Sequence, residues 1–226
     1  MAKLIVLIPA GGIGARLGRR TPKQFLTIGG DSILAATVLH FTRHPAIGAV
    51  VVAAPAAQVN RARLALRRVR RSDMITVVPG GPTRQESVWL ALQAAPDEAD
   101  LIVVHDAVRP FITRGLIDAV VGAARRTGAA ICALPVSETV KRVRGDEVEA
   151  TIDRTGLWTV QTPQAFRAAL LREAHEKARR DGVVGTDDAA LVERLGHPVK
   201  VVPGLAGNLK ITTPDDLRRA RRMAIS

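Results

Sequence analysis

The chain has 226 residues, of which 47% are hydrophobic and 24% are charged, and it contains one cysteine. This composition excludes a disordered chain, and the length suits one globular domain that buries roughly 70% of its unfolded surface. The lone Cys132 excludes an intrachain disulfide framework and fits a reducing compartment. Because no long apolar run occurs, we expect no membrane span and a cytoplasmic location.

Short apolar runs alternate with segments of helical periodicity along the chain. The expected strands are 4–8, 49–53, 74–78, 101–104, 129–134 and 199–202. The expected helices are 33–41, 57–71, 83–95, 114–126, 163–180 and 187–195, with a last helix after the capping signal Thr213-Pro214. Strands that are apolar on both faces and alternate with helices predict an α/β fold with a mostly parallel sheet flanked by helices. We expect a single domain over residues 1–226.

Residues 138–153 break this alternation. Val148 and Ile152 belong to a run of alternating residues that follows a turn-like Arg-Gly-Asp at 144–146. The pattern predicts a β-hairpin outside the main sheet. Because two strands alone are only marginally stable in water, we expect this arm to pack on a second copy of the chain in a homodimer.

The formal net charge of +12 raises the question of nucleic-acid binding. Six arginines between residues 61 and 71 flank an apolar stripe, as on the solvated sides of an amphipathic helix. Aromatic residues make up only 3% of the chain, so few side chains are available to stack on bases. We therefore expect no nucleic-acid partner and interpret the charge as a solvated surface that also steers small anions.

A glycine-rich loop, PAGGIGARLG at residues 9–18, follows the first expected strand. It matches neither the dinucleotide motif GxGxxG, because Leu17 stands at the third glycine position, nor the Walker motif. Backbone amides of such a loop bind phosphates, and Arg16 and Lys23 add cations at the carboxyl end of a parallel strand, where open α/β sheets bind ligands. A tight turn without a ligand is the alternative for the loop alone.

Two further segments carry polar residues at the same edge of the expected sheet. In VVHDAVRP, residues 103–110, Asp106 is placed to hold Mg²⁺, which takes one or two carboxylates and completes its shell with phosphates and water. The alternative is that Asp106 caps a turn or pairs with Arg109, and His105 is interpreted as structural. In PGGPTRQES, residues 79–87, Ser87 could bond to a base or ribose, although a capping box of Thr83 and Glu86 explains the same loop.

Taken in order, the segments PAGGIGARLG, PKQ, GGPTRQESV, HDAVRP, DRTGLWTVQTPQ, GTDDA and NLKITTPDD resemble the 2-C-methyl-D-erythritol 4-phosphate cytidylyltransferases through nearly the whole chain. The resemblance implies a Rossmann-like nucleotidyltransferase fold with a protruding β-hairpin dimerisation arm. It also implies transfer of CMP from CTP to 2-C-methyl-D-erythritol 4-phosphate, with Mg²⁺ present and pyrophosphate released.

The resemblance further implies roles for individual residues. The catalytic cations would be Arg16, Lys23 and Lys210. The residues matched to CTP are Ala10, Gly11, Gly12, Gly14, Gly81, Ser87 and Ala107. The residues matched to methylerythritol phosphate are Asp106, Arg109, Thr139 and Arg154, with Asp106 also the metal ligand. In the family, Thr139 and Arg154 lie on or beside the arm that crosses to the partner subunit.

Two other functions stay open at this point. One is a cytidylyltransferase for another polyol phosphate such as ribitol 5-phosphate, since that family shares the glycine loop and HDAxRP. The other is a non-catalytic RNA-binding protein on the same scaffold, which would have no need of a metal carboxylate.

Overall fold

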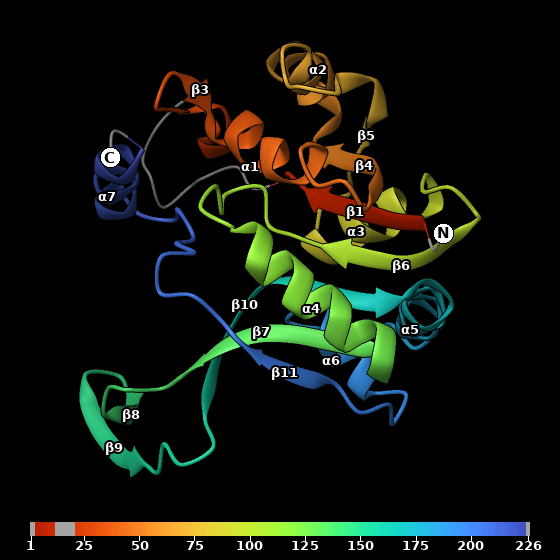
Figure 1. Ribbon diagram of the computed structural model, residues 1–226. Coiled ribbons are helices and arrows are strands. Elements are labelled where there is room, and N and C mark those ends of the chain that lie inside the picture. The colour runs from red at the N-terminus through yellow and green to blue at the C-terminus, as the bar shows by residue number, and fades with distance from the viewer. Residues whose placement is uncertain (1–2, 12–20, 225–226) are drawn as a thin grey trace.

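A seven-stranded sheet with strand order β11-β7-β10-β6-β1-β4-β5 forms the centre of the molecule (Figure 1). The computed structural model describes residues 3–11 and 21–224. The strands are β1 (Lys3–Pro9), β4 (Ile47–Ala54), β5 (Ile75–Pro79), β6 (Ala99–Val104), β7 (Ala129–Pro135), β10 (Trp158–Arg167) and β11 (Lys200–Pro203). Strand β10 is antiparallel to both neighbours, and every other neighbouring pair in this sheet is parallel. The predicted α/β fold with a mostly parallel sheet is confirmed.

Helices cover both faces of the sheet (Figure 1). One face carries α1 (Ile33–Thr42), α2 (Val59–Leu66) and α4 (Arg114–Thr127), and the other carries α3 (Arg84–Gln93), α5 (Ala168–Arg180) and α6 (Asp188–Glu193). Strand β1 shows why two cores form, because successive side chains of a strand point to opposite faces. Leu4, Val6 and Ile8 pack in the first core, and Ile5 and Leu7 pack in the second.

A third, smaller core joins the C-terminal helix to the loop that follows β6. It involves α7 (Pro214–Met223) and a small sheet of β2 (Thr27–Ile28) and β3 (Asp31–Ser32). Val108, Ile211 and Leu217 are buried in it. The small sheet was not predicted, although Gly29-Gly30, both with positive φ, is a hairpin turn signal.

The helix predicted over 163–180 begins only at Ala168, so that prediction was wrong for residues 163–167. These residues belong to β10, where Gln164 pairs with Val104 of β6 on one side and Ile131 of β7 on the other. Phe166 is fully buried in the second core. Pairing along both edges satisfies the backbone of this segment, and such tertiary contacts override a local helical period.

The helix predicted over 57–71 is shorter in the structure. A 3₁₀ turn at Ala56–Gln58 leads into α2, which ends at Leu66. The predicted apolar stripe is confirmed, because Val59, Ala62, Leu66 and Val69 are all buried. Arginine fills four of the positions 67–71, and like charges three and four residues apart disfavour a further helical turn.

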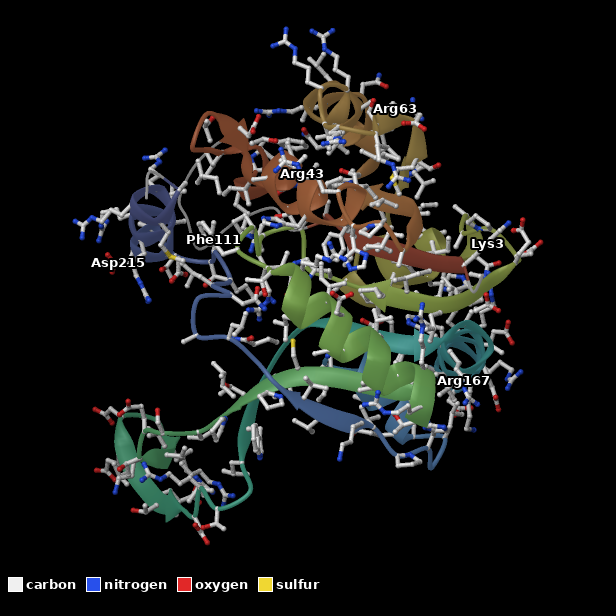
Figure 2. The ribbon with its side chains drawn as sticks, viewed as in Figure 1. Lys3, Arg43, Arg63, Phe111, Arg167 and Asp215 are labelled. Atoms are coloured by element: carbon white, nitrogen blue, oxygen red, sulfur yellow. The ribbon has the colours of Figure 1, made fainter. Side chains whose placement is uncertain are left out.

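Basic side chains lie at separate places on the surface (Figure 2). Arg43 and Arg63 lie near α1 and α2, whereas Lys3 lies at the start of β1 and Arg167 at the end of β10. Within residues 3–11 and 21–224, no helix is long and apolar enough to cross a membrane.

The arm stands away from the rest of the molecule (Figure 1). It consists of β8 (Val140–Arg144) and β9 (Glu147–Ile152), which pair only with each other, so the predicted hairpin outside the main sheet is confirmed. Val143 and Val148 on the arm are exposed, as are Leu157, Trp158 and Val160 at its base. Within the described chain, the arm and its base therefore leave apolar side chains partly exposed to solvent.

Candidate functional site

The site lies where the strand order of the sheet reverses. From β1 the chain continues to β4 and β5 on one side and then returns to β6 on the other. At such a reversal, open α/β sheets leave a crevice at the carboxyl edge of the strands. A cavity of about 320 Å³ occupies the crevice.

The cavity brings together residues from distant parts of the sequence. The predicted site residues that line it are Ala10, Gly11, Lys23, Gly81, Asp106, Ala107 and Lys210. Gln24, Thr83, Arg84 and Val108 also line it, together with Pro9 and Pro82, and the sequence analysis gave none of them a ligand role. Three predicted residues, Gly12, Gly14 and Arg16, lie outside the described residues.

Hydrogen bonds and close contacts fix the loops that form the walls. The buried side chain of Gln24 donates from Nε2 to the carbonyl oxygen of Ala10, 2.8 Å away. A Cβ atom at position 81 would lie 2.4 Å from the Cβ of Glu86, so only glycine allows the loop to approach α3 this closely. Thr83 and Glu86 form the predicted capping box. The loop at Gly81 and the N-terminal cap of α3 therefore form one wall of the cavity.

Ser87 lies behind this wall and does not line the cavity. Its side chain is fully buried, and Oγ is 2.9 Å from the carbonyl oxygen of Thr83 and 3.2 Å from that of Gly81. This geometry holds the loop in place. A direct contact between Ser87 and CTP stays a prediction.

Asp106 is surrounded by three cations. Its Oδ1 is 3.3 Å from Nε of Arg84, and its Oδ2 is 2.9 Å from Nζ of Lys210 and 3.4 Å from Nε of Arg109. Burial raises the pKa of Asp106, but the combined charges of Arg84, Lys210 and Arg109 outweigh it and hold the pKa well below its usual range. The carboxylate is therefore ionised. The sequence analysis gave a pairing of Asp106 with Arg109 as an alternative to metal binding, and this pairing is present as one of the three contacts.

Lys210 reaches Asp106 because its segment is anchored to the loop after β6. The backbone N–H of Ile211 donates to the carbonyl oxygen of Val108 at 2.9 Å. Arg109 donates from its guanidinium to the carbonyl oxygen of Asn208 at 2.8 Å. These bonds join two segments that are about a hundred residues apart in sequence.

His105 is a structural residue, as expected. It is fully buried, with Nδ1 3.1 Å from the hydroxyl of Thr162 and Nε2 3.1 Å from the carbonyl oxygen of Arg109. The same hydroxyl accepts a hydrogen bond from the backbone N–H of Asp106 at 3.0 Å. Burial lowers the pKa of His105 to about 4, so the ring is neutral near pH 7 and fixes the turn that carries Asp106.

A second cavity of about 250 Å³ adjoins the first. It is lined by Arg84, Asp106, Arg109, Val160, Gln161, Thr162, Gln164, Thr186, Asp187 and Lys210. Sequence analysis gave most of its polar residues no role, although they belong to the segments VQTPQ and GTDDA. The signal was the run of amide and hydroxyl side chains at Gln161, Thr162 and Gln164, which spans the predicted start of a helix at residue 163.

Thr139 and Arg154 line neither cavity. Both are exposed, and a guanidinium nitrogen of Arg154 donates to the carbonyl oxygen of Ser137 at the base of the arm. Within one chain the structure does not bring these two residues to the other site residues. Their roles stay predictions.

The donor set at the site offers one carboxylate to a metal ion. In the described part of the chain, no three His, Cys, Asp or Glu side chains cluster in a way that could hold a metal. Asp106 lines both cavities. A single carboxylate fits Mg²⁺, which uses one or two carboxylates and takes its other ligands from substrate phosphates and water.

Known proteins resemble the chain over almost its full length. The family model of 2-C-methyl-D-erythritol 4-phosphate cytidylyltransferase matches residues 4–225. The protein of this name from Salinibacter ruber is 46% identical over 220 residues, covering 97% of this chain and 92% of that protein. The one from Syntrophus aciditrophicus is 42% identical over 217 residues, covering 95% and 93%.

A solved structure agrees with these relatives. The crystal structure of 2-C-methyl-D-erythritol 4-phosphate cytidylyltransferase from Thermus thermophilus matches with a TM-score of 0.84 and 40% identity, covering 99% of this chain and 100% of that one. With the family model, the relatives and the fold in agreement, the chain belongs to the 2-C-methyl-D-erythritol 4-phosphate cytidylyltransferase family.

Proposed function

We propose that cytidylyl transfer takes place where the two cavities meet. The chain is a cytidylyltransferase that joins CTP and 2-C-methyl-D-erythritol 4-phosphate into 4-diphosphocytidyl-2-C-methyl-D-erythritol and releases pyrophosphate. A reaction between two phosphates needs a space for each substrate and a common point where the phosphates come together. Arg84, Asp106 and Lys210 line both cavities, and this sharing carries the proposal.

The chemistry of the two linings suggests which substrate each cavity takes. The first lies between two glycine-containing loops, with Pro9, Pro82 and Ala107 as apolar contacts for a base and ribose. The second offers the hydroxyls of Thr162 and Thr186, side-chain amides and the guanidinium of Arg109. We assign CTP to the first and the polyol phosphate to the second, where the hydroxyl groups of the substrate find hydrogen-bond partners.

Cations around the junction offset the main obstacle to the reaction. The substrate phosphate attacks the α-phosphorus of CTP in line, which brings two anions together. Lys23 in the first cavity and Lys210 in both cavities supply positive charge, which stabilises the additional negative charge of the transition state. The attacking phosphate is ionised at neutral pH, so no general base is needed. The buried, neutral His105 agrees with this.

We assign Asp106 as the ligand of a Mg²⁺ ion. When bound with the nucleotide, the ion would reduce the negative charge of the triphosphate oxygens. The side chain of Lys210 is 43% exposed, whereas that of Asp106 is 9% exposed. Lys210 therefore has room to move from Asp106 toward a phosphate when the substrates bind.

We infer that the active enzyme is a homodimer whose arms cross between subunits. The support is the exposed apolar surface of the arm and its base, at Val143, Val148 and Trp158. Arg154 sits at the base of the same arm, and a crossing arm would carry it to the site of the partner subunit.

Replacement of Lys23 tests the assignment of the first cavity. Because Lys23 stabilises the transition state more than ground-state CTP, Lys23→Ala should lower kcat by about 10² to 10³, with a smaller change in the KM for CTP. The matched control is Lys3→Ala, since Lys3 pairs with Glu98 at the opposite end of β1. Steady-state kinetics of pyrophosphate release measure both, and a near-normal kcat for Lys23→Ala would contradict the assignment.

A further inference from the structure

A line of four polar side chains runs from the second core to the junction of the cavities. The guanidinium of Arg84 contacts two carboxylates, with Nε 3.3 Å from Oδ1 of Asp106 and Nη1 2.8 Å from Oδ2 of Asp188. The other oxygen of Asp188, Oδ1, is 3.0 Å from Nε2 of His175. Asp188 and His175 are almost completely buried, so this line is part of the protein interior.

Three helices hold this line of side chains in place. Arg84 is the first residue of α3, His175 lies on α5, and Asp188 is the first residue of α6. Trp89 of α3 stacks against His175 with the ring centroids 6.3 Å apart. All three helices pack in the second core, so the distances among Arg84, His175 and Asp188 are set by packed helices, whereas Asp106 lies on the loop after β6.

Arg84 is poorly placed for the stability of its own helix. A cation in the first turn of a helix is opposed by the helix dipole, which favours anions there. Asp106 and Asp188 compensate that charge. Burying a carboxylate such as Asp188 costs free energy unless the charge is paired. A buried, paired charge of this kind is a candidate for holding neighbouring side chains in one arrangement.

Arg84 also differs from the other two partners of Asp106. Arg84 also contacts the buried carboxylate of Asp188, whereas the side chain of Lys210 is 43% exposed and that of Arg109 contacts the backbone at Asn208. The remaining nitrogen of Arg84, Nη2, is buried without a hydrogen-bond partner in the described structure. The contact with Asp188 therefore ties Arg84 to the protein interior while it also contacts Asp106.

We propose that Asp188 is a positioning residue for the transfer reaction. It anchors Arg84, and Arg84 in turn holds the carboxylate of Asp106 in the orientation required at the junction of the two cavities. The proposal rests on the proposed function, because Asp106 matters to the reaction only if transfer takes place there.

The first test is Asp188→Asn, which keeps the shape of the side chain and removes its charge. We expect kcat to fall by about tenfold or more while the KM for CTP changes by less than about twofold, because the substitution changes the orientation of Asp106 at the junction and leaves the loops and apolar contacts of the CTP cavity in place. The matched control is Asp118→Asn. Asp118 also contacts a buried histidine, His44, at 2.9 Å, but it lines neither cavity, and its replacement should leave kcat unchanged.

The second test separates positioning from a general loss of stability. If Asp188 acts through Arg84, Asp188→Asn should change kcat by less than about twofold in an Arg84→Met background, because the two substitutions break the same connection. Effects that multiply would overturn the proposal. If circular dichroism shows that Arg84→Met is not folded, Arg84→Lys takes its place, since an ammonium group cannot reproduce the planar fork between two carboxylates.

The outcomes also distinguish this proposal from the proposed function. A wild-type protein that releases no pyrophosphate from CTP with methylerythritol phosphate would contradict the proposed function. An active wild type with a fully active Asp188→Asn variant would overturn the positioning role alone.

Discussion

At the scale of single residues, buried charge at the site is balanced by partners that lie far away in sequence. Arg84 and Asp188 are 104 positions apart, and Lys210 contacts Asp106 across a similar separation. Motifs show which residue types are present but not which of them meet in space. Gly11, Gly81 and Asp106 could be selected from local pattern, whereas the contact between Arg84 and Asp188 could not.

His105 predicts a specific dependence of stability on pH. Its pKa is about 4 in the folded protein and about 6.5 in an unfolded chain, so the unfolded state binds more protons between these values. The free energy of unfolding should therefore fall as the pH is lowered from about 6.5 to about 4, by up to about 3 kcal/mol from this residue. Urea unfolding at several pH values measures the change.

A variant separates His105 from other groups that titrate in acid. His40 also has a pKa lowered by burial and contributes in the same direction, so the comparison of wild type with His105→Gln isolates His105. Asp106 and Asp188 have lowered pKa values and lose their contribution only below about pH 4. An unchanged pH dependence in His105→Gln would show that His105 is not the buried neutral group described here.

At the scale of elements, the wall of the first cavity depends on the N-terminus of α3. The Oγ1 of Thr83 accepts a hydrogen bond from the backbone N–H of Glu86 at 3.1 Å. This cap precedes Arg84, the first residue of α3. Thr83→Ala should lower the free energy of unfolding by about 1 kcal/mol. It should also raise the KM for CTP, because Thr83 lines the cavity.

The control for this prediction is a cap away from the site. Thr113 caps α4 by accepting a hydrogen bond from Leu116, and it lines neither cavity. Thr113→Ala should lower the free energy of unfolding, measured by urea titration, by a similar amount. It should leave the KM for CTP unchanged. If Thr83→Ala affects stability alone, this wall does not contact the nucleotide.

Elements with both local and tertiary support were predictable from the sequence. The strand at Leu101–Val104 has a continuous apolar run and is buried inside β6, and the capping signals at Thr83 and Thr213 mark real helix starts. Strand β10 was missed because its position between β6 and β7 is decided by pairing with residues more than twenty positions away. Gln161, Thr162 and Gln164 of the second cavity were missed with it.

At the scale of the whole molecule, the arm predicts an active site shared between subunits. Arg154→Ala and Lys23→Ala homodimers should each be nearly inactive, since every site would lack one cation. In a heterodimer of the two variants, one site receives Lys23 from one chain and Arg154 from the other. Twofold symmetry then predicts activity near half that of the wild-type dimer, scaled by the fraction of heterodimer.

Differently tagged subunits allow this heterodimer to be purified and assayed directly. Mixed wild-type subunits with the same two tags provide the control for losses during exchange. Purified heterodimers without any recovered activity would mean that Arg154 acts within its own chain. A chain that remains monomeric would contradict the inference of a homodimer itself.

This chain transfers the cytidylyl group of CTP to methylerythritol phosphate, and we place the transfer at the junction of its two cavities. The most direct measurement is pyrophosphate release with Mg²⁺, with CTP or UTP as the nucleotide and with 2-C-methyl-D-erythritol 4-phosphate or ribitol 5-phosphate as the acceptor. We predict rapid release only with CTP and methylerythritol phosphate together. With UTP, hydrogen-bond acceptors that face the exocyclic amine of cytosine would be left buried and unpaired, at a cost in free energy of about 1 to 3 kcal/mol each. Equal release with ribitol 5-phosphate, or none with methylerythritol phosphate, would contradict the account.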